Sequence, residues 1–373
     1  MTGRQRGVER ALAQIDGWIV ESGVTAAAAA VWHRGDVVAE RYAGDVRPGK
    51  PVDADTLFSL ASVTKPVTAA VAMSLVDEGL IGLDEPVTRF VPEFARTTGD
   101  EPGPFDAGRR LIGLRQLLSH TSGLPEDLPP GRLPSRGMPD LSAITDALTG
   151  QPLAYEPGTQ LIYSNAGFAL LGRVVERITG NDPWEEARDR ILDPLGLTDI
   201  VARPDEAAVY RIPAVSDARN AGTAHEGYNS AYSRGLAMPW AGLVGSAPNL
   251  ARFAGSFLSG ASPLSRTTRS MMTADQAGGV TGGVQSMRVT WEPAHWGFGW
   301  EVKGAKRRHW TGELTSPATF CHFGATGTLL WADPAHDLAL AVFGNRMTTH
   351  LWPFVPAARW ARLSNALVAA VDR

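Results

Sequence analysis

The sequence predicts an α+β fold in which one antiparallel sheet is flanked by N- and C-terminal helices and a large, mainly helical region is inserted. Three observations lead to this prediction. Strand-like segments lie near both ends of the chain, helical periodicity dominates the middle, and amphipathic patterns occupy both terminal stretches. Strands from both ends can share one sheet only if the middle is an insertion. We therefore expect residues 1–58 and 290–373 to form a sheet domain and residues 59–289 a mainly helical domain.

The N-terminal part is predicted to hold a helix and a hairpin. Apolar residues recur at helical spacing over about residues 5–22, and Gly23 is a suitable helix end. Residues 24–32 and 37–42 have strand character on either side of a short turn, which predicts an antiparallel hairpin. These elements begin the sheet domain.

The middle of the chain is predicted to alternate helices with loops. Apolar residues at helical spacing, glycines at helix ends and a proline after a capping serine mark four helices. Repeated prolines mark one long irregular loop. The predicted helices lie around residues 67–79, 114–118, 170–180 and 246–257, and the loop covers residues 123–140.

Strand character returns in the C-terminal part. An Asp-Pro-Ala-His turn at residues 333–336 separates the last two strands, and a final helix has Trp360, Leu363 and Leu367 on one side. The predicted strands cover residues 296–303, 309–313, 317–323, 326–331 and 338–345. Their number is sufficient to complete a sheet with the N-terminal hairpin.

Composition excludes several function classes. The chain has 373 residues, 44% of them hydrophobic and 20% charged, with a net charge of -4, which is typical of a soluble globular protein. This charge gives no reason to expect a nucleic acid or a membrane as partner, and no apolar run reaches the ~18 residues of a membrane span. The absence of a signal-like apolar stretch at Met1 favours a cytoplasmic location, while the oligomeric state stays open. The single cysteine, Cys321, excludes an intrachain disulfide.

The strongest local signal is Ser62-Val63-Thr64-Lys65 at the start of a predicted helix. The chain uses arginine for most of its positive charge, so a lysine here is unusual, and lysine, unlike arginine, can lose its proton when buried. Side chains three residues apart on a helix share one face. An amine whose pKa is lowered by burial can take the proton of a neighbouring serine and make it a nucleophile. A helix-capping serine beside a solvated lysine is the structural alternative.

Four motifs in this order resemble the serine β-lactamase-related superfamily. They are FSLASVTK at residues 58–65, LLSHTSGL at 117–124, YEPGTQLIYSNAGFALLG at 155–172 and HFGATGT at 322–328. The pattern is similar to class C β-lactamases, penicillin-binding proteins, D-amino-acid peptidases and acyltransferases, and is closest to family VIII carboxylesterases. The resemblance spans about residues 24–343 and implies a β-lactamase/transpeptidase-like fold with the active site at the junction of the two domains.

The resemblance implies a role for each matching residue. Ser62 would be the acylated nucleophile and Lys65 its proton partner, while Tyr163 would act as a base or relay the proton to the leaving group. Asn165 would hydrogen-bond the lysine and the acyl side of the substrate, and the backbone N–H groups of Ser62 and Ala325 would form the oxyanion hole. A phenol is a base at neutral pH only beside a cation, so we expect a charged Lys65 to favour the phenolate of Tyr163.

The sequence departs from the β-lactamase pattern at one position. Where those enzymes carry Lys-Thr-Gly, this chain has His322-Phe323-Gly324. The lysine is associated with the carboxylate of β-lactams, whereas a histidine is mostly neutral near pH 7. His322 and Gly324 are candidate substrate-binding residues. The histidine favours an esterase, amidase or acyl-transfer enzyme over a dedicated β-lactamase.

Other chemistries have no support in the sequence. No metal-ligand spacing, phosphate-binding glycine loop or G-x-S-x-G motif is present, so we predict no metal and no cofactor. Cys321 and His322 are neighbours on a predicted strand and therefore point to opposite faces. His120 lies in a motif that is mainly structural in the family.

The sequence thus predicts a serine hydrolase that forms an acyl-enzyme on Ser62, with small carboxylic esters as the preferred substrates. Two alternatives stay open. One is a cytoplasmic acyltransferase, or a D-amino-acid peptidase or amidase, of a biosynthetic pathway. The other is a β-lactam-binding protein with weak β-lactamase activity. In each case the partner is a small-molecule ester or amide.

Overall fold

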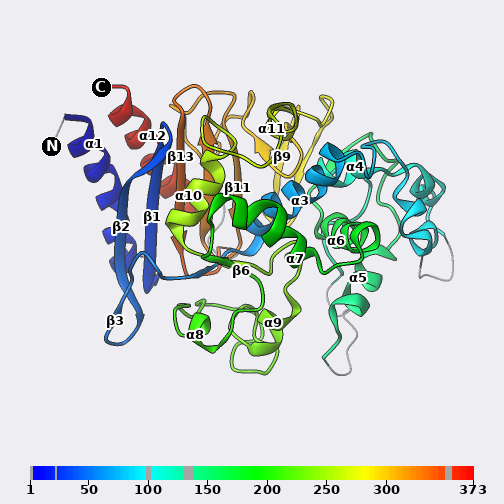
Figure 1. The fold of residues 1–373 in the computed structure, drawn as a ribbon, viewed down its shortest axis with the longest axis horizontal. Coiled ribbons are helices and arrows are strands. Elements are labelled where there is room, and N and C mark those ends of the chain that lie inside the picture. Colours follow the sequence, from blue (N-terminus) through cyan, green and yellow to red (C-terminus); the bar gives the residue numbers. More distant parts are fainter. Residues whose placement is uncertain (1–2, 22, 98–101, 130–137, 349–354) are drawn as a thin grey trace.

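A seven-stranded antiparallel sheet forms one end of the molecule, and a group of helices forms the other (Figure 1). The computed structural model describes residues 3–21, 23–97, 102–129, 138–348 and 355–373. Helices from both ends of the chain lie side by side on the outer face of the sheet. The predicted α+β fold with a large, mainly helical insertion is confirmed.

The sheet joins strands from the two ends of the sequence. The N-terminal hairpin pairs with the C-terminal strands through β1 and β13, where Ala27 faces Gly344 and His33 faces Leu338. The strand order is β10-β11-β12-β13-β1-β2-β3. The strands are β1 Ala26–His33, β2 Asp36–Arg47, β3 Lys50–Pro51, β10 Glu301–Val302, β11 Phe320–Gly324, β12 Thr328–Asp333 and β13 Leu338–Gly344.

Both faces of the sheet are covered, because every residue of β1 is buried. Alternate residues of a strand point to opposite faces, and the small alanines of β1 divide between two hydrophobic cores accordingly. Helix α10 covers one face, and α1 with α12 covers the other (Figure 1). The backbone of Gly255 in α10 approaches Trp32 so closely that a Cβ there would lie 2.5 Å from the indole.

The insertion is built around α3, which is buried on nearly all sides because it runs between the sheet and the other helices. The helices of the chain are α1 Gly3–Leu12, α2 Asp16–Glu21, α3 Lys65–Asp77, α4 Leu114–Leu118, α5 Leu141–Thr149, α6 Asn165–Thr179, α7 Pro183–Ala187, α8 Glu206–Val209, α9 Ala231–Leu236, α10 Ala247–Gly255, α11 Arg266–Thr273 and α12 Val355–Val371. Single turns of tighter or wider helix lie at Ala13–Ile15, Ala61–Thr64, Val87–Arg89, Pro92–Ala95, Asp106–Leu111, Arg188–Leu192 and Asp193–Leu195.

Two small sheets in the insertion position the candidate site. One contains β4 Phe58–Ser59, β7 Val244–Gly245 and β6 Ile200–Val201, and the other contains β5 Leu161–Ile162, β8 Gly282–Val284 and β9 Val289–Trp291. Strand β4 ends three residues before Ser62, and β5 ends immediately before Tyr163. The domain division at residues 58/59 and 289/290 stays a prediction.

Some local predictions were wrong. Residues 309–313, predicted as a strand, form turns, and residues 296–303 contribute only the short strand β10. The reason is the ammonium of Lys303, which donates to the carbonyls of Gly312 and Thr315 at 2.9 and 2.5 Å and so holds the chain in a loop around itself. The described part of the loop at residues 123–140 contains no helix or strand, and residues 130–137 lie outside the described residues. Among the described helices, none has the length and apolar character needed to cross a membrane.

Candidate active site

Ser62 lies on a strained turn between β4 and α3. The preceding residue, Ala61, has a φ of 47°, which a non-glycine residue adopts at an energetic cost. A tight helical turn, Ala61–Thr64, continues directly into α3, where Pro66 is tolerated because the first N–H groups of a helix have no partner. This turn places Ser62 and Lys65 together, with Lys65 Nζ at 3.1 Å from Ser62 Oγ.

The amine of Lys65 is fully buried and has three hydrogen-bond partners among the described residues. Besides Ser62 Oγ, it lies 2.8 Å from Asn165 Oδ1 and 2.9 Å from the carbonyl oxygen of Trp240. Burial lowers the pKa of Lys65 well below its ordinary value, although the negative charges of Glu126 and Asp127 act in the opposite direction. A neutral amine has two N–H donors and one lone pair. The two carbonyl-type oxygens can only accept, so the lone pair is left for the hydroxyl of Ser62.

Asn165 is fixed by three hydrogen bonds at the start of α6. Its backbone N–H donates to the carbonyl oxygen of Glu126 at 2.8 Å, and its Nδ2 donates to Asp127 Oδ2 at 3.3 Å. The preceding residue, Ser164, caps the helix by accepting from the N–H of Gly167. The contact with Asp127 therefore turns Oδ1 of Asn165 toward Lys65.

Tyr163 packs against Lys65 and His120. The Nζ atom of Lys65 lies 4.6 Å from the centroid of the phenol ring, and the ring of His120 lies 4.7 Å away. The hydroxyl is buried and makes no hydrogen bond of regular geometry with the described residues. Burial raises the pKa of Tyr163 well above its ordinary value, and the nearby hydroxyl of Ser62 offsets only part of this effect.

These pKa shifts oppose the expectation that a charged Lys65 holds Tyr163 as a phenolate. The pKa of the amine is lowered and that of the phenol is raised, and burial is the largest cause of both shifts. Burial disfavours whichever form of a group is charged. Both shifts therefore favour a neutral amine beside a neutral phenol.

His322 lies on β11 and is completely buried. Its Nδ1–H donates to the carbonyl oxygen of Phe323 at 2.9 Å, and its Nε2 has no hydrogen-bond partner among the described residues. Burial lowers the pKa of His322 to about 3. The imidazole is 5.9 Å from the ring of Tyr163 and carries no charge at neutral pH.

The end of β11 lies directly against the turn that carries Ser62. The hydroxyl of Thr326 donates to the carbonyl of Ser59 at 2.5 Å, and that of Thr328 donates to the carbonyl of Leu60 at 3.0 Å. A Cβ on Gly324 would lie 2.3 Å from the same Leu60 carbonyl oxygen. Beside it, the carbonyl of Ala325 accepts from the N–H of Thr348 at 2.8 Å, which fixes the orientation of that peptide.

The structure thus brings together all seven residues that the sequence analysis gives as site candidates, and further residues lie beside them. The carbonyl of Trp240, the carboxylates of Glu126 and Asp127, and the ring of His120 also belong to the cluster. His120 carries a sequence signal, because it lies in the LLSHTSGL motif, and its Nδ1 accepts from the N–H of Ser164 at 3.0 Å. No comparable signal marks Trp240, because its contribution is a backbone carbonyl.

Replacing Lys65 with methionine is expected to change how stability depends on pH. The folded chain holds Lys65 at a pKa well below 10.5, whereas the unfolded chain returns it to about 10.5. Between these two values the unfolded chain binds a proton that the folded chain does not, so the wild type gains stability as pH rises. In urea unfolding between neutral pH and 10.5, the free energy of unfolding of the wild type should rise relative to that of the Lys65→Met variant. The prediction is contradicted if the unfolding free energies of the wild type and Lys65→Met change with pH in the same way. The control variant is Lys50→Met.

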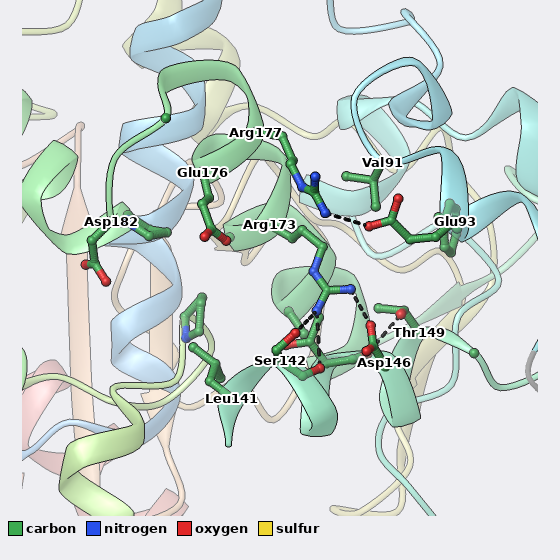
Figure 2. A pocket seen from close by; sticks show the side chains of 18 of the residues that line it. Val91, Glu93, Leu141, Ser142, Asp146, Thr149, Arg173, Glu176, Arg177 and Asp182 are labelled. Carbon is green, nitrogen blue, oxygen red and sulfur yellow. Dashed lines mark hydrogen bonds and ion pairs between the residues drawn. The ribbon is translucent and has the colours of Figure 1, made fainter. Parts of the chain in front are cut away.

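A cavity lies away from this cluster, between α5, α6 and the turn Pro92–Ala95 (Figure 2). Its volume is about 950 Å³, and none of the seven nominated residues lines it. Figure 2 shows two ion pairs among its lining side chains, Arg173 with Asp146 and Arg177 with Glu93. It is a salt-bridged surface groove and not an extension of the candidate site.

Comparison with protein families connects this geometry to known proteins. The family model described as Beta-lactamase matches residues 8–362. Protein Rv1367c of Mycobacterium tuberculosis is 40% identical over 184 residues, which is 45% of this chain and 45% of that protein, so the match spans less than half of that relative. A protein of Escherichia coli (strain K12), named "Putative D-alanyl-D-alanine carboxypeptidase", is 27% identical over 83% of this chain and 74% of its own length.

Solved structures agree with the family match. A β-lactamase from Mycobacterium bovis is 28% identical, with a TM-score of 0.65 over 97% of this chain and 99% of that one. A penicillin-binding protein homologue from Caulobacter crescentus is 24% identical, with a TM-score of 0.78 over 98% and 97% of the two chains. A family VIII carboxylesterase is 21% identical, with a TM-score of 0.76 over 99% and 98%. The last two show likeness of fold alone.

Proposed function

The chain belongs to the β-lactamase family of serine hydrolases, and from this membership and the site geometry we propose that it forms an acyl-enzyme on Ser62 and hydrolyses small carboxylic esters. The observation that carries the proposal is the environment of Lys65. A fully buried amine, with two acceptor oxygens and one serine hydroxyl around it, is set to take the proton of Ser62.

Acylation follows from the contacts. Ser62 Oγ attacks the ester carbonyl while its proton moves to the lone pair of Lys65, and the backbone N–H groups of Ser62 and Ala325 receive the negative charge of the tetrahedral intermediate. The new ammonium lies over the ring of Tyr163, 4.6 Å from its centroid. Tyr163, a neutral phenol, then donates its proton to the leaving alcohol and regains one from Lys65. The carbon–oxygen bond of the ester breaks and the acyl group remains on Ser62.

Deacylation reverses the same proton path. A water attacks the acyl carbonyl while Tyr163 accepts its proton and passes its own to Lys65. The bond between the acyl carbon and Ser62 Oγ then breaks, and Lys65 returns the proton to Ser62 Oγ, which restores the hydroxyl and the neutral amine. The negative charges of Glu126 and Asp127 raise the pKa of Lys65 and so oppose the effect of burial. Burial and the two carboxylates thus have opposite effects on the pKa of Lys65. An amine whose pKa lies between these extremes is suited to accept and release a proton in one cycle.

The charges around the site favour substrates without a carboxylate. His322 is neutral, because burial holds its pKa at about 3. Asp127 carries an exposed carboxylate beside Asn165, and Glu126 is a second carboxyl group whose charge reaches Lys65. A substrate carboxylate near these groups is repelled, which favours neutral esters.

The test compares two aryl esters of equal length, p-nitrophenyl butyrate and mono-p-nitrophenyl succinate. We expect hydrolysis of the butyrate and a kcat/KM about tenfold or more lower for the succinate, because like charges near a protein surface repel by about 1.4 kcal/mol or more, the free energy that corresponds to a factor of ten. A fluorophosphonate should add its mass to the peptide that contains Ser62, and Ser62→Ala should lose both the label and the hydrolysis. Full esterase activity in Ser62→Ala would end the proposal.

One observation favours a second candidate, an amidase or peptidase for substrates with an amino group on the acyl side. The carboxylate of Asp127 lies 3.3 Å from Nδ2 of Asn165, the residue that the family resemblance places beside the acyl group. An ammonium group of a substrate would be attracted to that position. Turnover of D-amino-acid p-nitroanilides that exceeds turnover of their N-acetylated forms would support this candidate over a plain esterase.

A further inference from the structure

Behind the candidate site lies a buried cluster of charged side chains that the proposed chemistry does not use. Two of the four lysines of the chain, Lys303 and Lys306, are buried within it. The side chains of Lys306 and Glu301 have no exposed area. The Nζ atom of Lys306 lies 2.9 Å from Oε1 of Glu301, so the two form an ion pair in the interior of the protein.

Every partner of the Glu301 carboxylate is a hydrogen-bond donor. Besides Lys306, it accepts from Nε2 of His309 at 3.1 Å and from Nε1 of Trp310 at 2.7 Å. These partners hold the pKa of Glu301 at about 2, although burial alone would raise it. Glu301 is therefore an ionised carboxylate with its hydrogen-bonding capacity largely filled.

A metal ion is a poor fit for this cluster. Glu301, His309 and Cys321 place ligand-type atoms within 4.8 Å of one another, which is close enough for coordination. However, the carboxylate is already neutralised by Lys306, and His309 uses its Nε2 proton in the bond to Glu301. Burial also raises the pKa of Cys321 well above its ordinary value, so its sulfur is a thiol and not the thiolate that a metal requires.

The ion pair contacts the catalytic cluster through Trp296. Lys306 Nζ lies 5.6 Å from the ring centroid of Trp296 and donates to the carbonyl of the preceding residue, His295, at 2.8 Å. The indole of Trp296 lies 5.7 Å from the ring of Tyr163. It is also edge-on to the rings of His120 and His322, at 4.9 and 6.0 Å.

The sheet supplies a second connection. Glu301 in β10 faces Cys321 in β11, and the next residue along β11 is His322. The ion pair therefore reaches Tyr163 through Trp296, and Glu301 lies on the strand that pairs with the one carrying His322.

Stability alone does not explain this ion pair. Removing two charges from water costs several kcal/mol per ion, and replacing a buried pair by apolar residues is often neutral or stabilising. A cluster of aromatic rings such as Trp296, Tyr163 and His322 would pack without it. The ion pair has an explanation if it fixes the relative positions of these rings, which packing alone does not fix.

We propose that the Glu301–Lys306 ion pair is a positioning device that holds Trp296 and, through it, the hydroxyl of Tyr163 in register with Ser62. The proposal rests on the proposed function of Ser62 and Tyr163. Glu301 and Lys306 are positioning residues, because neither touches Ser62 or Lys65 in the described structure.

The test is the double variant Glu301→Gln, Lys306→Met, which removes both charges and keeps the side-chain volumes. We expect it to fold, to keep the KM for p-nitrophenyl butyrate within about twofold, and to lose about ten- to a hundredfold in kcat, since small misplacements of catalytic groups cost rates of that order. The matched control is Lys303→Met, which removes a lysine equally buried but bonded to the carbonyls of Gly312 and Thr315. Its kcat should stay within about twofold of wild type, whatever its thermal stability.

A crystal structure of the double variant makes the test independent of the esterase assay. Displacement or loss of order at Trp296 and Tyr163 would support the proposal, and unchanged positions of both side chains would overturn it, as would an unchanged kcat. Failure of the proposed function is recognised separately, because then wild-type protein takes up no fluorophosphonate at Ser62. Equal losses of kcat in the double variant and in Lys303→Met would also overturn the proposal, since a general loss of rigidity would then explain both.

Discussion

Lys65→Arg is expected to lower kcat for ester hydrolysis by about 10²- to 10⁴-fold, the range that a positioned general base contributes. Arginine keeps its proton in proteins and so has no lone pair for the hydroxyl of Ser62. The loss would follow from the chemistry of the side chain and not from its charge at the surface, because Lys65 has no exposed area.

The geometry around Lys65 makes this substitution more severe than a change of charge alone. The compact amine reaches Asn165 Oδ1 and the Trp240 carbonyl oxygen at 2.8 and 2.9 Å, and a planar guanidinium in the same space cannot keep both contacts and the approach to Ser62. Steady-state kinetics with p-nitrophenyl butyrate measure the loss. The control is Lys50→Arg in the edge strand β3, which should retain wild-type kcat. A Lys65→Arg variant with more than about a tenth of wild-type kcat would exclude Lys65 as the base.

Gly324→Ala is expected to lower kcat by about 10²- to 10³-fold, the loss associated with one oxyanion-hole donor. The added Cβ would lie 2.2 Å from Oγ1 of Thr328 and 2.3 Å from the carbonyl oxygen of Leu60, distances that the backbone must increase. The end of β11 would then move away from the turn that carries Ser62. Because Ala325 is the next residue, its N–H would move away from the reacting carbonyl.

The control for Gly324→Ala is Gly235→Ala in α9, where a Cβ meets nothing within 4 Å. An alanine is favoured over glycine in a helix, so this variant should keep both wild-type kcat and stability. Thermal unfolding of both variants shows whether a lower kcat of Gly324→Ala comes from a local displacement or from loss of the folded state. A Gly324→Ala variant with unchanged kcat would mean that the end of β11 has no part in the reaction.

The broad fold was predictable because it depends on periodicity. The apolar positions of α6 and α10 recur at helical spacing, so a local pattern carries this information. Strand β1 is buried on both faces and is recognisable only as an apolar run that ends at a turn. The prediction failed at residues 309–313, where a single buried lysine, Lys303, bends the chain by hydrogen bonds to backbone carbonyls. Such a contact leaves no period in the sequence.

The sequence by itself determined the pairing of Ser62 with Lys65, because three residues on one helical turn place both side chains on the same face. It also determined that a histidine stands at position 322, where the β-lactamase pattern has a lysine. Only the tertiary structure decided the state of these groups. The pKa of the amine is lowered and that of the phenol is raised, because strands and helices from distant parts of the chain exclude water around them. The carbonyl of Trp240 and the ion pair behind Trp296 reach the site through contacts that depend on how the chain folds back, which no local pattern records.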